Sequence, residues 1–322
     1  FLPVLEETIA AVRERTDAPI VLGGCGLSIF AERILRETGV EFAVRGDGER
    51  AIVALDAALS DGRDFAAVPG LIWRDGDEIR ANEPAWSDVL ALPTTRDAID
   101  NAKYFRLGGQ GGVETKRGCP RQCIYCADPL AKGTVVRPRE PSEVADEIES
   151  LAAQGVDVLH TCDGEFNVPG GHARAICEEL IRRKIGQKVR WYAYLAVVPF
   201  DDDLADNMRR AGCAGVNFTG DSACDSVLAT YRKAHRREDL EKAVRLCRKH
   251  DLAVMIDLLL GGPGETPETV ADSIDVLKRL DPDCVGAALG MRLYPGTPAH
   301  GLLLREGPLE TNPGLRRRYD GP

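Results

Sequence analysis

The feature that most constrains the fold is a regular alternation of strand-like and helix-like segments from residue 113 onward. The strand-like segments are 113–116, 156–162, 189–197, 214–219, 252–260 and 284–292. The helical segments are 141–153, 171–184, 201–211, 236–249 and 267–279. Strands that alternate with helices form a parallel sheet covered by helices. Because a complete barrel has eight such units, six units predict an α/β fold with a partial (β/α)6 TIM-like barrel.

A shorter α/β pattern occupies residues 1–62 and predicts a parallel, doubly wound sheet of Rossmann-like type. Its strand-like segments, 19–24 and 41–49, contain glycines near their carboxyl ends, where such sheets bind ligands. Gly23 and Gly24 lack a Cβ, which lets a ligand approach the backbone, although a plain tight turn explains two glycines equally well.

Two further segments complete the predicted domain organisation. Residues 63–112 are expected to form a linker that contains a hairpin at 70–80 and ends in the glycine-rich stretch 108–112. The barrel domain is expected over 113–300, and 301–322 is expected to begin a C-terminal extension. The chain starts within a helical pattern, so we expect further sequence beyond both ends.

Three cysteines directly follow the first predicted barrel strand. Cys119, Cys123 and Cys126 have a C-x3-C-x2-C spacing. A [4Fe–4S] cluster normally takes four Cys thiolates, so three would leave one iron open to a reactant. Active sites of barrels lie at this end of the strands. Zinc is an alternative, but it would need a fourth ligand, for which Cys162 is the nearest candidate.

Other polar or glycine-rich segments also follow predicted strands. They are 161–167, 217–222, 260–266 and 292–298. In the first, Gly164 permits a sharp turn, while Asp163 and Glu165 can accept hydrogen bonds from an ammonium group. Each segment alone could be an ordinary turn. Because they would surround the same mouth of the barrel as the cysteines, together they favour a binding site.

Composition narrows the classes of partner. The net charge of −10 argues against a generally basic surface, so nucleic acid is not expected as a partner. No apolar run approaches the roughly 20 residues that span a bilayer, so no membrane association is expected. Ten cysteines without a secretory segment are typical of reduced thiols and predict a cytoplasmic protein.

Taken together, these motifs resemble the radical S-adenosylmethionine (SAM) superfamily. The resemblance rests on the cysteine loop, on 163–165, on 261–266 and on 294–297. Residues 21–24 and 44–49 resemble the later half of the cobalamin-binding domain that precedes the barrel in many members. The similarity extends from about residue 19 to residue 300.

The resemblance implies a role for each matching position. Cys119, Cys123 and Cys126 would hold a [4Fe–4S] cluster, and Gly23 and Gly24 would accommodate the cobalamin tail. The positions implied to bind SAM are Tyr125, Asp163, Gly164, Glu165, Asp221, Ser222, Gly262 and Tyr294.

Within the SAM set, the implied contacts differ. Tyr125 would lie near the adenine, and Glu165 would contact the amino group of SAM. Asp221 and Ser222 would contact the ribose and the methionine end. Asp163 stands where the family has the first glycine of a Gly-Gly-Glu stretch.

The resemblance also implies an activity. A low-potential donor such as flavodoxin or ferredoxin would reduce the cluster, SAM would be cleaved, and a methyl group would pass through methylcobalamin to an unactivated carbon of a small molecule or biosynthetic intermediate. The cofactors implied are a [4Fe–4S] cluster, SAM and cobalamin. The Asp-x-His-x-x-Gly signature of many cobalamin domains does not occur in this chain, and Asp47 stands where the family often has Glu.

Three alternatives to methyl transfer remain open. A cobalamin-domain enzyme of the same family could instead perform ring closure or rearrangement. A tRNA methylthiotransferase would need a second cysteine triad in its N-terminal domain, where this chain has Cys25 alone. A structural or electron-transfer metal protein would need no SAM site.

Several residues could accept a proton, but none is assigned to catalysis: Tyr192, Tyr194, His160 and Arg292. Tyr192 and Tyr194 alternate on the third strand, so both are expected to face the barrel interior, with at least one in core packing. Four histidines are expected at the surface: His172, His235, His250 and His300.

Overall fold

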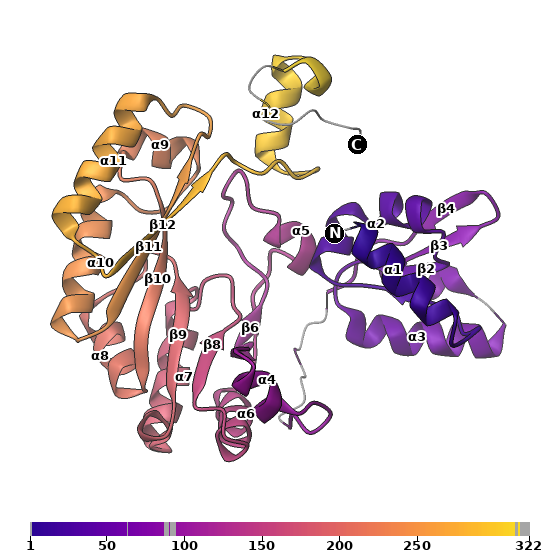
Figure 1. The fold of residues 1–322 in the computed structure, drawn as a ribbon, viewed down its shortest axis with the longest axis horizontal. Helices are drawn as coiled ribbons and strands as arrows, with labels where there is room; N and C mark the ends of the chain where they lie inside the picture. The colour runs from indigo at the N-terminus through magenta and orange to yellow at the C-terminus, as the bar shows by residue number, and fades with distance from the viewer. Residues whose placement is uncertain (1, 63, 87–89, 91–94, 313–314, 316–322) are drawn as a thin grey trace. The chain divides into compact units, whose positions relative to one another are not determined.

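The computed structural model describes residues 2–62, 64–86, 90, 95–312 and 315 (Figure 1). The chain forms two compact units. Unit 1 comprises Phe1–Asp88, Ala127–Thr134 and Tyr294–Pro322, and unit 2 comprises Val89–Cys126 and Val135–Leu293. The chain therefore leaves unit 2 directly after the last cysteine of the triad and returns to it at residue 135.

Unit 2 is built on a six-stranded, all-parallel sheet whose strand order follows the chain. Its strands are β5 (Gly111–Val113), β8 (Val158–Thr161), β9 (Arg190–Leu195), β10 (Cys213–Asp221), β11 (Ala253–Leu260) and β12 (Cys284–Leu289). The long helices of its connections are α6 (Pro141–Ala153), α7 (Gly170–Arg182), α8 (Asp202–Arg210), α10 (Arg237–Lys249) and α11 (Pro267–Leu280). The sheet is open, with β5 and β12 at its edges, which confirms the predicted α/β fold with a partial barrel.

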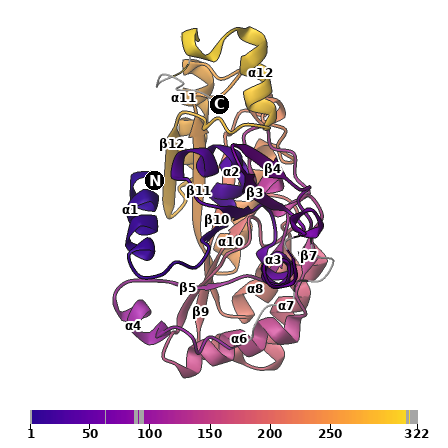
Figure 2. The same ribbon diagram turned by 90° about the vertical axis from the view of Figure 1, so that its right-hand side faces the viewer.

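The long helices all lie on one face of this sheet (Figures 1 and 2). Along β9, Trp191, Ala193 and Leu195 are buried against the helices, as the two-residue period of a strand requires. Tyr192 and Tyr194 point to the opposite face, called the inner face below, and are 37% and 41% exposed. Both tyrosines therefore face inward as predicted, but the expectation that one would pack in the core is wrong.

Short elements of unit 2 escaped the sequence analysis. β6 (Lys116–Arg117) and β7 (Arg137–Pro138) form an antiparallel pair at the base of the cysteine loop. The remaining short elements are α4 (Asn101–Arg106), η2 (Ile185–Gln187) and α9 (Asp225–Thr230).

The first barrel strand also begins earlier than predicted. Gly111 and Gly112, expected in a flexible stretch, form part of β5. A Cβ on Gly111 would come within 2.6 Å of Leu159, and one on Gly112 within 2.6 Å of the Cys162 sulfur. These glycines therefore allow close packing rather than flexibility.

Unit 1 contains a four-stranded sheet in the order β1-β2-β3-β4, parallel between β1 and β2 and antiparallel elsewhere. Its strands are β1 (Val21–Leu22), β2 (Phe42–Val44), β3 (Leu71–Asp75) and β4 (Glu78–Ala81). Its helices are α1 (Leu2–Arg13), α2 (Cys25–Thr38), α3 (Gly48–Asp61), η1 (Phe65–Ala67), α5 (Asp128–Lys132), α12 (Pro298–Glu306) and η3 (Leu309–Thr311). The predicted hairpin at 70–80 is present, and it completes this sheet rather than linking two domains.

Alternating residues of β2 and β3 build two small cores in unit 1. Phe42 and Val44 pack with α3, whereas Ala43 packs with α2, so these helices cover opposite faces. Part of the expected C-terminal extension, 313–314 and 316–322, lies outside the described residues. Within the described part of the chain, no helix has the length and apolar character needed to cross a bilayer.

Candidate functional site

The cysteine triad lies in the loop that follows β6, at the carboxyl-end edge of the sheet in unit 2. Cys119, Cys123 and Cys126 form no disulfide bond, and each is partly buried. The N–H of Cys126 donates to the carbonyl of Cys123 (3.2 Å), and the N–H of Ile124 donates to the carbonyl of Tyr231 (3.2 Å). These bonds hold the loop in a tight turn and tie it to the end of α9.

Three thiols are a donor set suited to an iron–sulfur cluster. Over the residues that the structure describes, no three His, Cys, Asp or Glu side chains converge as the ligands of one metal ion would. Three thiolates of a [4Fe–4S] cluster instead bind three different irons and so need no common centre.

A buried lysine lies beside the triad. Lys233, in the loop between α9 and α10, is 5% exposed and places its Nζ 3.0 Å from Asp221 Oδ2 and 3.4 Å from Thr219 Oγ1. Burial opposes the charge of Lys233, but the negative charges of Asp221, Cys123 and Glu165 outweigh it and raise its pKa. Burial raises the pKa of the Cys123 thiol, and the Lys233 ammonium counteracts that shift. No motif in the sequence had indicated Lys233.

Asp221 connects this lysine to the cysteine loop. It ends β10 after a shift in strand register and has a φ of 61°, a left-handed conformation that Asp tolerates better than most residues. The Tyr125 hydroxyl donates a hydrogen bond to Asp221 Oδ2. Burial and the neighbouring carboxylate raise the pKa of Tyr125 far above its ordinary range, so its hydroxyl stays protonated.

Glu165 carries a buried oxygen that has no hydrogen-bond partner. Its Oε1 accepts from Thr219 Oγ1 (3.3 Å), while its Oε2, although 3.5 Å from Arg121 Nε, makes no hydrogen bond in the described structure. Glu165 and Cys123 line one small cavity together with Arg121 and Lys233. A buried acceptor of this kind calls for a donor, which suits the predicted contact with an amino group.

Asp163, unlike Glu165, has its carboxylate fully engaged in hydrogen bonds within the protein. Its carboxylate is buried and accepts from the Thr115 N–H (2.8 Å), the Thr115 hydroxyl (2.6 Å) and the Lys116 N–H (3.2 Å). Burial raises the pKa of this carboxyl group, against the effect of these donors. The side chain thus holds the segment that leads into the cysteine loop, while Gly164 beside it forms an exposed turn.

Two other residues predicted to bind SAM form hydrogen bonds within the protein, near the ends of strands β10 and β11. Ser222 is fully buried, with its Oγ 3.1 Å from Ser273 Oγ and accepting from the Cys224 N–H (3.1 Å). Gly262 donates its N–H to the Tyr231 hydroxyl (3.1 Å), and a Cβ there would lie 2.2 Å from that hydroxyl. Both residues shape the ends of β10 and β11, and their direct contact with SAM stays a prediction.

The remaining predicted ligand residues belong to unit 1. Gly23 and Gly24 join β1 to α2, and the buried Ser28 on α2 accepts a hydrogen bond from the Gly46 N–H (3.1 Å), which links α2 to the segment that follows β2. A Cβ on Gly23 would meet no atom within 4 Å, so packing within the protein does not require that glycine. Tyr294 packs its ring 6.2 Å from that of Phe30 on α2.

One sequence-based expectation about the histidines is wrong. His235 is 4% exposed rather than at the surface, and its Nε2 lies 3.2 Å from the Gly220 carbonyl oxygen. Burial lowers the pKa of His235 to about 4, so it is neutral near pH 7. A single histidine in a loop carries no sequence signal that would distinguish these environments.

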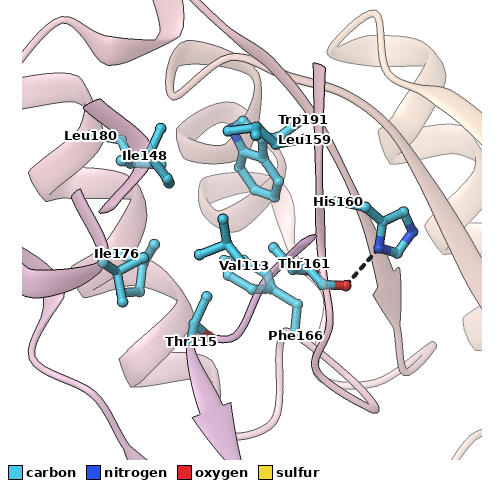
Figure 3. A pocket seen from close by; sticks show the side chains of 11 residues that line it. Val113, Thr115, Ile148, Leu159, His160, Thr161, Phe166, Ile176, Leu180 and Trp191 are labelled. Carbon is cyan, nitrogen blue, oxygen red and sulfur yellow. Dashed lines mark hydrogen bonds between the residues drawn. The ribbon is translucent and has the colours of Figure 1, made fainter. Parts of the chain in front are cut away.

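A second cavity does not belong to the site. It lies between the sheet and helices α6 and α7, and its lining is mostly apolar, including Val113, Ile176 and Trp191 (Figure 3). The His160 ring lies to one side of these residues, with Nδ1 2.6 Å from the Thr161 carbonyl oxygen (Figure 3). This cavity is therefore part of the core.

The site of unit 2 thus combines an open parallel sheet with three clustered thiols at its carboxyl ends, beside buried acidic and cationic groups. Residues 113–277 match the family model of the Radical SAM superfamily. The chain belongs to the radical SAM superfamily.

Individual relatives narrow the subgroup. The chain is 32% identical to a tryptophan 2-C-methyltransferase of Streptomyces laurentii, over 92% of this chain and 60% of that protein. It is 30% identical to an anaerobic magnesium-protoporphyrin IX monomethyl ester cyclase of Cereibacter sphaeroides, over 87% of this chain and 48% of that protein. This chain therefore spans 60% or less of the length of these two curated relatives.

Solved structures agree with this grouping. The radical SAM methyltransferase TsrM from Kitasatospora setae has been solved with cobalamin and a [4Fe–4S] cluster, and with tryptophan and a SAM analogue. These structures superpose on 95% of this chain, and on 61% of TsrM, with TM-scores of 0.86 and 0.87 at 34% and 36% identity. The resemblance to the subgroup with a cobalamin-binding domain is thereby confirmed.

Proposed function

We propose that this protein is a cobalamin-dependent radical SAM enzyme that transfers a methyl group to a small-molecule substrate. The observation that carries the proposal is the grouping of three cysteine thiols with the buried Oε2 of Glu165, which accepts no hydrogen bond in the described structure, at the carboxyl ends of the sheet. The similarity to methyltransferases over 92% and 95% of the chain supports the reaction type.

The residues of unit 2 fit the cluster and SAM. Three thiols supply the ligands of a cluster with one open iron, and the buried Lys233 offsets the negative charge that thiolates bring. Glu165 offers an acceptor to an ammonium group, and Asp221 fixes the orientation of the Tyr125 hydroxyl. When bound, the cluster would supply the electron that cleaves SAM and cobalamin would carry the methyl group.

The residues of unit 1 fit a large planar or extended ligand at the sheet edge. The parallel strands β1 and β2 lie side by side and end at Leu22 and Val44, just before Gly23 and Gly46, and ligands of open α/β sheets bind at such ends. Gly23 has neither a close neighbour nor a positive φ that would explain the missing side chain. Close approach of the cobalamin tail to the backbone would explain it.

The proposal includes a protein that donates electrons. A low-potential protein donor such as flavodoxin or ferredoxin would deliver electrons, since SAM cleavage needs a reduced cluster.

Ring closure is the second candidate reaction, favoured by the 30% identity to a cyclase over 87% of this chain. Product analysis separates the two, because only methyl transfer adds the carbon of SAM to the substrate.

Metal and corrinoid content test the proposal. The full chain is reconstituted anaerobically with iron, sulfide and hydroxocobalamin, desalted, and analysed for both cofactors. We expect Cys119→Ala, Cys123→Ala and Cys126→Ala each to lose most of the iron, whereas Cys284→Ala, at an exposed position on β12, retains it. Iron retention by the triad variants, or wild-type protein that holds iron but no corrinoid, would contradict the proposal.

A further inference from the structure

A row of polar and aromatic side chains crosses the inner face of the sheet in unit 2. This inner row consists of His160 on β8, Tyr194 on β9, Asn217 on β10 and Asp257 on β11. The rings of His160 and Tyr194 lie 4.9 Å apart, and Tyr194 pairs with Asn217 across the strands. Asn217 Nδ2 donates to Asp257 Oδ2 (2.8 Å), so the row is continuous from β8 to β11.

The far end of the row presents acceptor oxygens of Asn217 and Asp257. Asn217 Oδ1 is buried and has no hydrogen-bond partner in the described structure. The Asn217 amide nitrogen already donates a hydrogen bond to Asp257. Among the described residues, no Lys, Arg or His side chain forms an ion pair with the Asp257 carboxylate. Buried acceptors are normally satisfied, and a partly buried carboxylate favours a cationic or N–H partner.

Independent evidence comes from the neighbouring strand. Gly286 on β12 pairs with Asp257, and a Cβ at Gly286 would lie 2.0 Å from Asp257 Oδ1. Gly286 has no positive φ, so its backbone conformation does not demand glycine. The glycine instead leaves space for the carboxylate to lie on the inner face.

The inner row is distinct from the predicted contact with the amino group of SAM. Thr219 lies two residues beyond Asn217 on the same face of β10, and its hydroxyl bonds to Glu165 (3.3 Å). Two residues along a strand correspond to about 6–7 Å. The inner row therefore lies about 6–7 Å further from the carboxyl ends of the strands than the contact between Thr219 and Glu165.

We propose that Asn217 and Asp257 form a substrate-recognition subsite for a molecule that presents an N–H donor, either a protonated amine or the ring N–H of a heteroaromatic group. Asn217 Oδ1 and the Asp257 carboxylate accept from that donor, and the Tyr194 and His160 rings provide an aromatic wall on which a cation or a flat ring packs. This assignment rests on the proposed small-molecule methyl transfer and names the chemistry of its substrate.

Matched probes test the assignment by equilibrium binding to the reconstituted full chain. Phenethylamine is compared with 2-phenylethanol, and indole with 1-methylindole, so each pair differs in its N–H donor. At least one N–H probe is expected to bind, and to bind more tightly than its counterpart. The pair that shows the difference identifies an ammonium or a ring N–H.

Two variants of the subsite accompany the probes. Asp257→Asn keeps the volume and the contact with Asn217, and it should weaken amine binding by about tenfold to a hundredfold, the worth of a hydrogen bond to a charged group. Gly286→Ala should weaken binding of the same probe, because the added Cβ displaces the carboxylate. Asp275→Asn, an exposed position on α11 with the same charge change, should bind like the wild type.

The outcomes that overturn the inference are separate from those that overturn the proposed function. Equal binding within both probe pairs, or no binding of either N–H probe, overturns the subsite. Loss of SAM binding in Asp257→Asn overturns it as well, because the carboxylate would then belong to the SAM site. A failure of the proposed function would appear instead as wild-type protein without corrinoid or without SAM cleavage.

Discussion

Replacing Asp163 with alanine should destabilise the protein by about 3 kcal/mol, since three donors lose their acceptor. The side chain is 4% exposed and accepts from the Thr115 N–H, the Thr115 hydroxyl and the Lys116 N–H at 2.8, 2.6 and 3.2 Å. Each unsatisfied buried donor costs about 1–3 kcal/mol. The lower end of this range, about 1 kcal/mol for each donor, applies here. Burial opposes the charge of the Asp163 carboxylate and raises its pKa, so removing the carboxylate offsets part of the loss.

Urea denaturation of the apoprotein measures this loss. Asp163→Asn retains an acceptor oxygen for the backbone donors and should cost about 1 kcal/mol. Asp157→Ala, at an exposed position just before β8, is the matched control and should stay within about 0.5 kcal/mol of the wild type. Because Thr115 and Lys116 lead directly into the cysteine loop, iron retention after reconstitution should fall in the order wild type, Asp163→Asn, Asp163→Ala.

The reasoning would be refuted by an Asp163→Ala variant as stable as Asp157→Ala. It would be refuted equally by normal stability and normal iron content combined with weak SAM binding. That second result would return Asp163 to the SAM contact that the family resemblance implies.

Three further predictions concern other parts of the two units. Gly23→Ala should leave stability within about 0.5 kcal/mol and weaken corrinoid binding, whereas Gly24→Ala, at a φ of 97°, should lose about 1 kcal/mol in urea denaturation; equal stability effects would contradict this. The folded-state pKa of His235, about 4 against an ordinary 6.5, lies below that of the unfolded chain. Its stabilising contribution is therefore complete above pH 6.5 and falls by about 2 kcal/mol between pH 7 and pH 5; His235→Gln should flatten that part of the stability profile, and an unchanged slope would refute the assignment. Lys233→Met should make the cluster's midpoint potential more negative in an electron paramagnetic resonance titration, because a buried positive charge beside Cys123 favours the added electron, while Lys233→Arg should restore it; identical potentials would contradict that role.

The parts of the fold that the sequence predicts are those with long periodic patterns. The helix predicted at 141–153 is found with the same bounds, and that at 236–249 differs by one residue from Arg237–Lys249. The pair β6–β7 and the helix α9 escaped prediction, because elements of two to six residues have no periodicity to recognise. Gly111 and Gly112 were misplaced because a glycine required by close packing looks, in sequence, like a glycine in a flexible turn.

The candidate site divides in a similar way. The cysteine triad is visible in sequence because its members lie close together along the chain. Lys233 and the contact between Asn217 and Asp257 are not visible, because they depend on strand register and on loops that fold back over the sheet. A motif position can also suggest the wrong contact. The position of Asp163 in its motif suggests a contact with a ligand, whereas in the structure its carboxylate accepts hydrogen bonds from Thr115 and Lys116.

The fate of an isotopically labelled methyl group of SAM tests the central claim most directly. The full chain, reconstituted with iron, sulfide and hydroxocobalamin, is incubated anaerobically with labelled SAM and a low-potential reductant, and the protein-bound corrinoid is analysed by mass spectrometry. The account predicts a labelled methyl group on the bound corrinoid of the wild type and none in Cys123→Ala. Corrinoid that remains unlabelled while SAM is consumed would contradict methyl transfer and favour the ring-closure alternative, and a chain that retains no corrinoid would contradict the central claim itself.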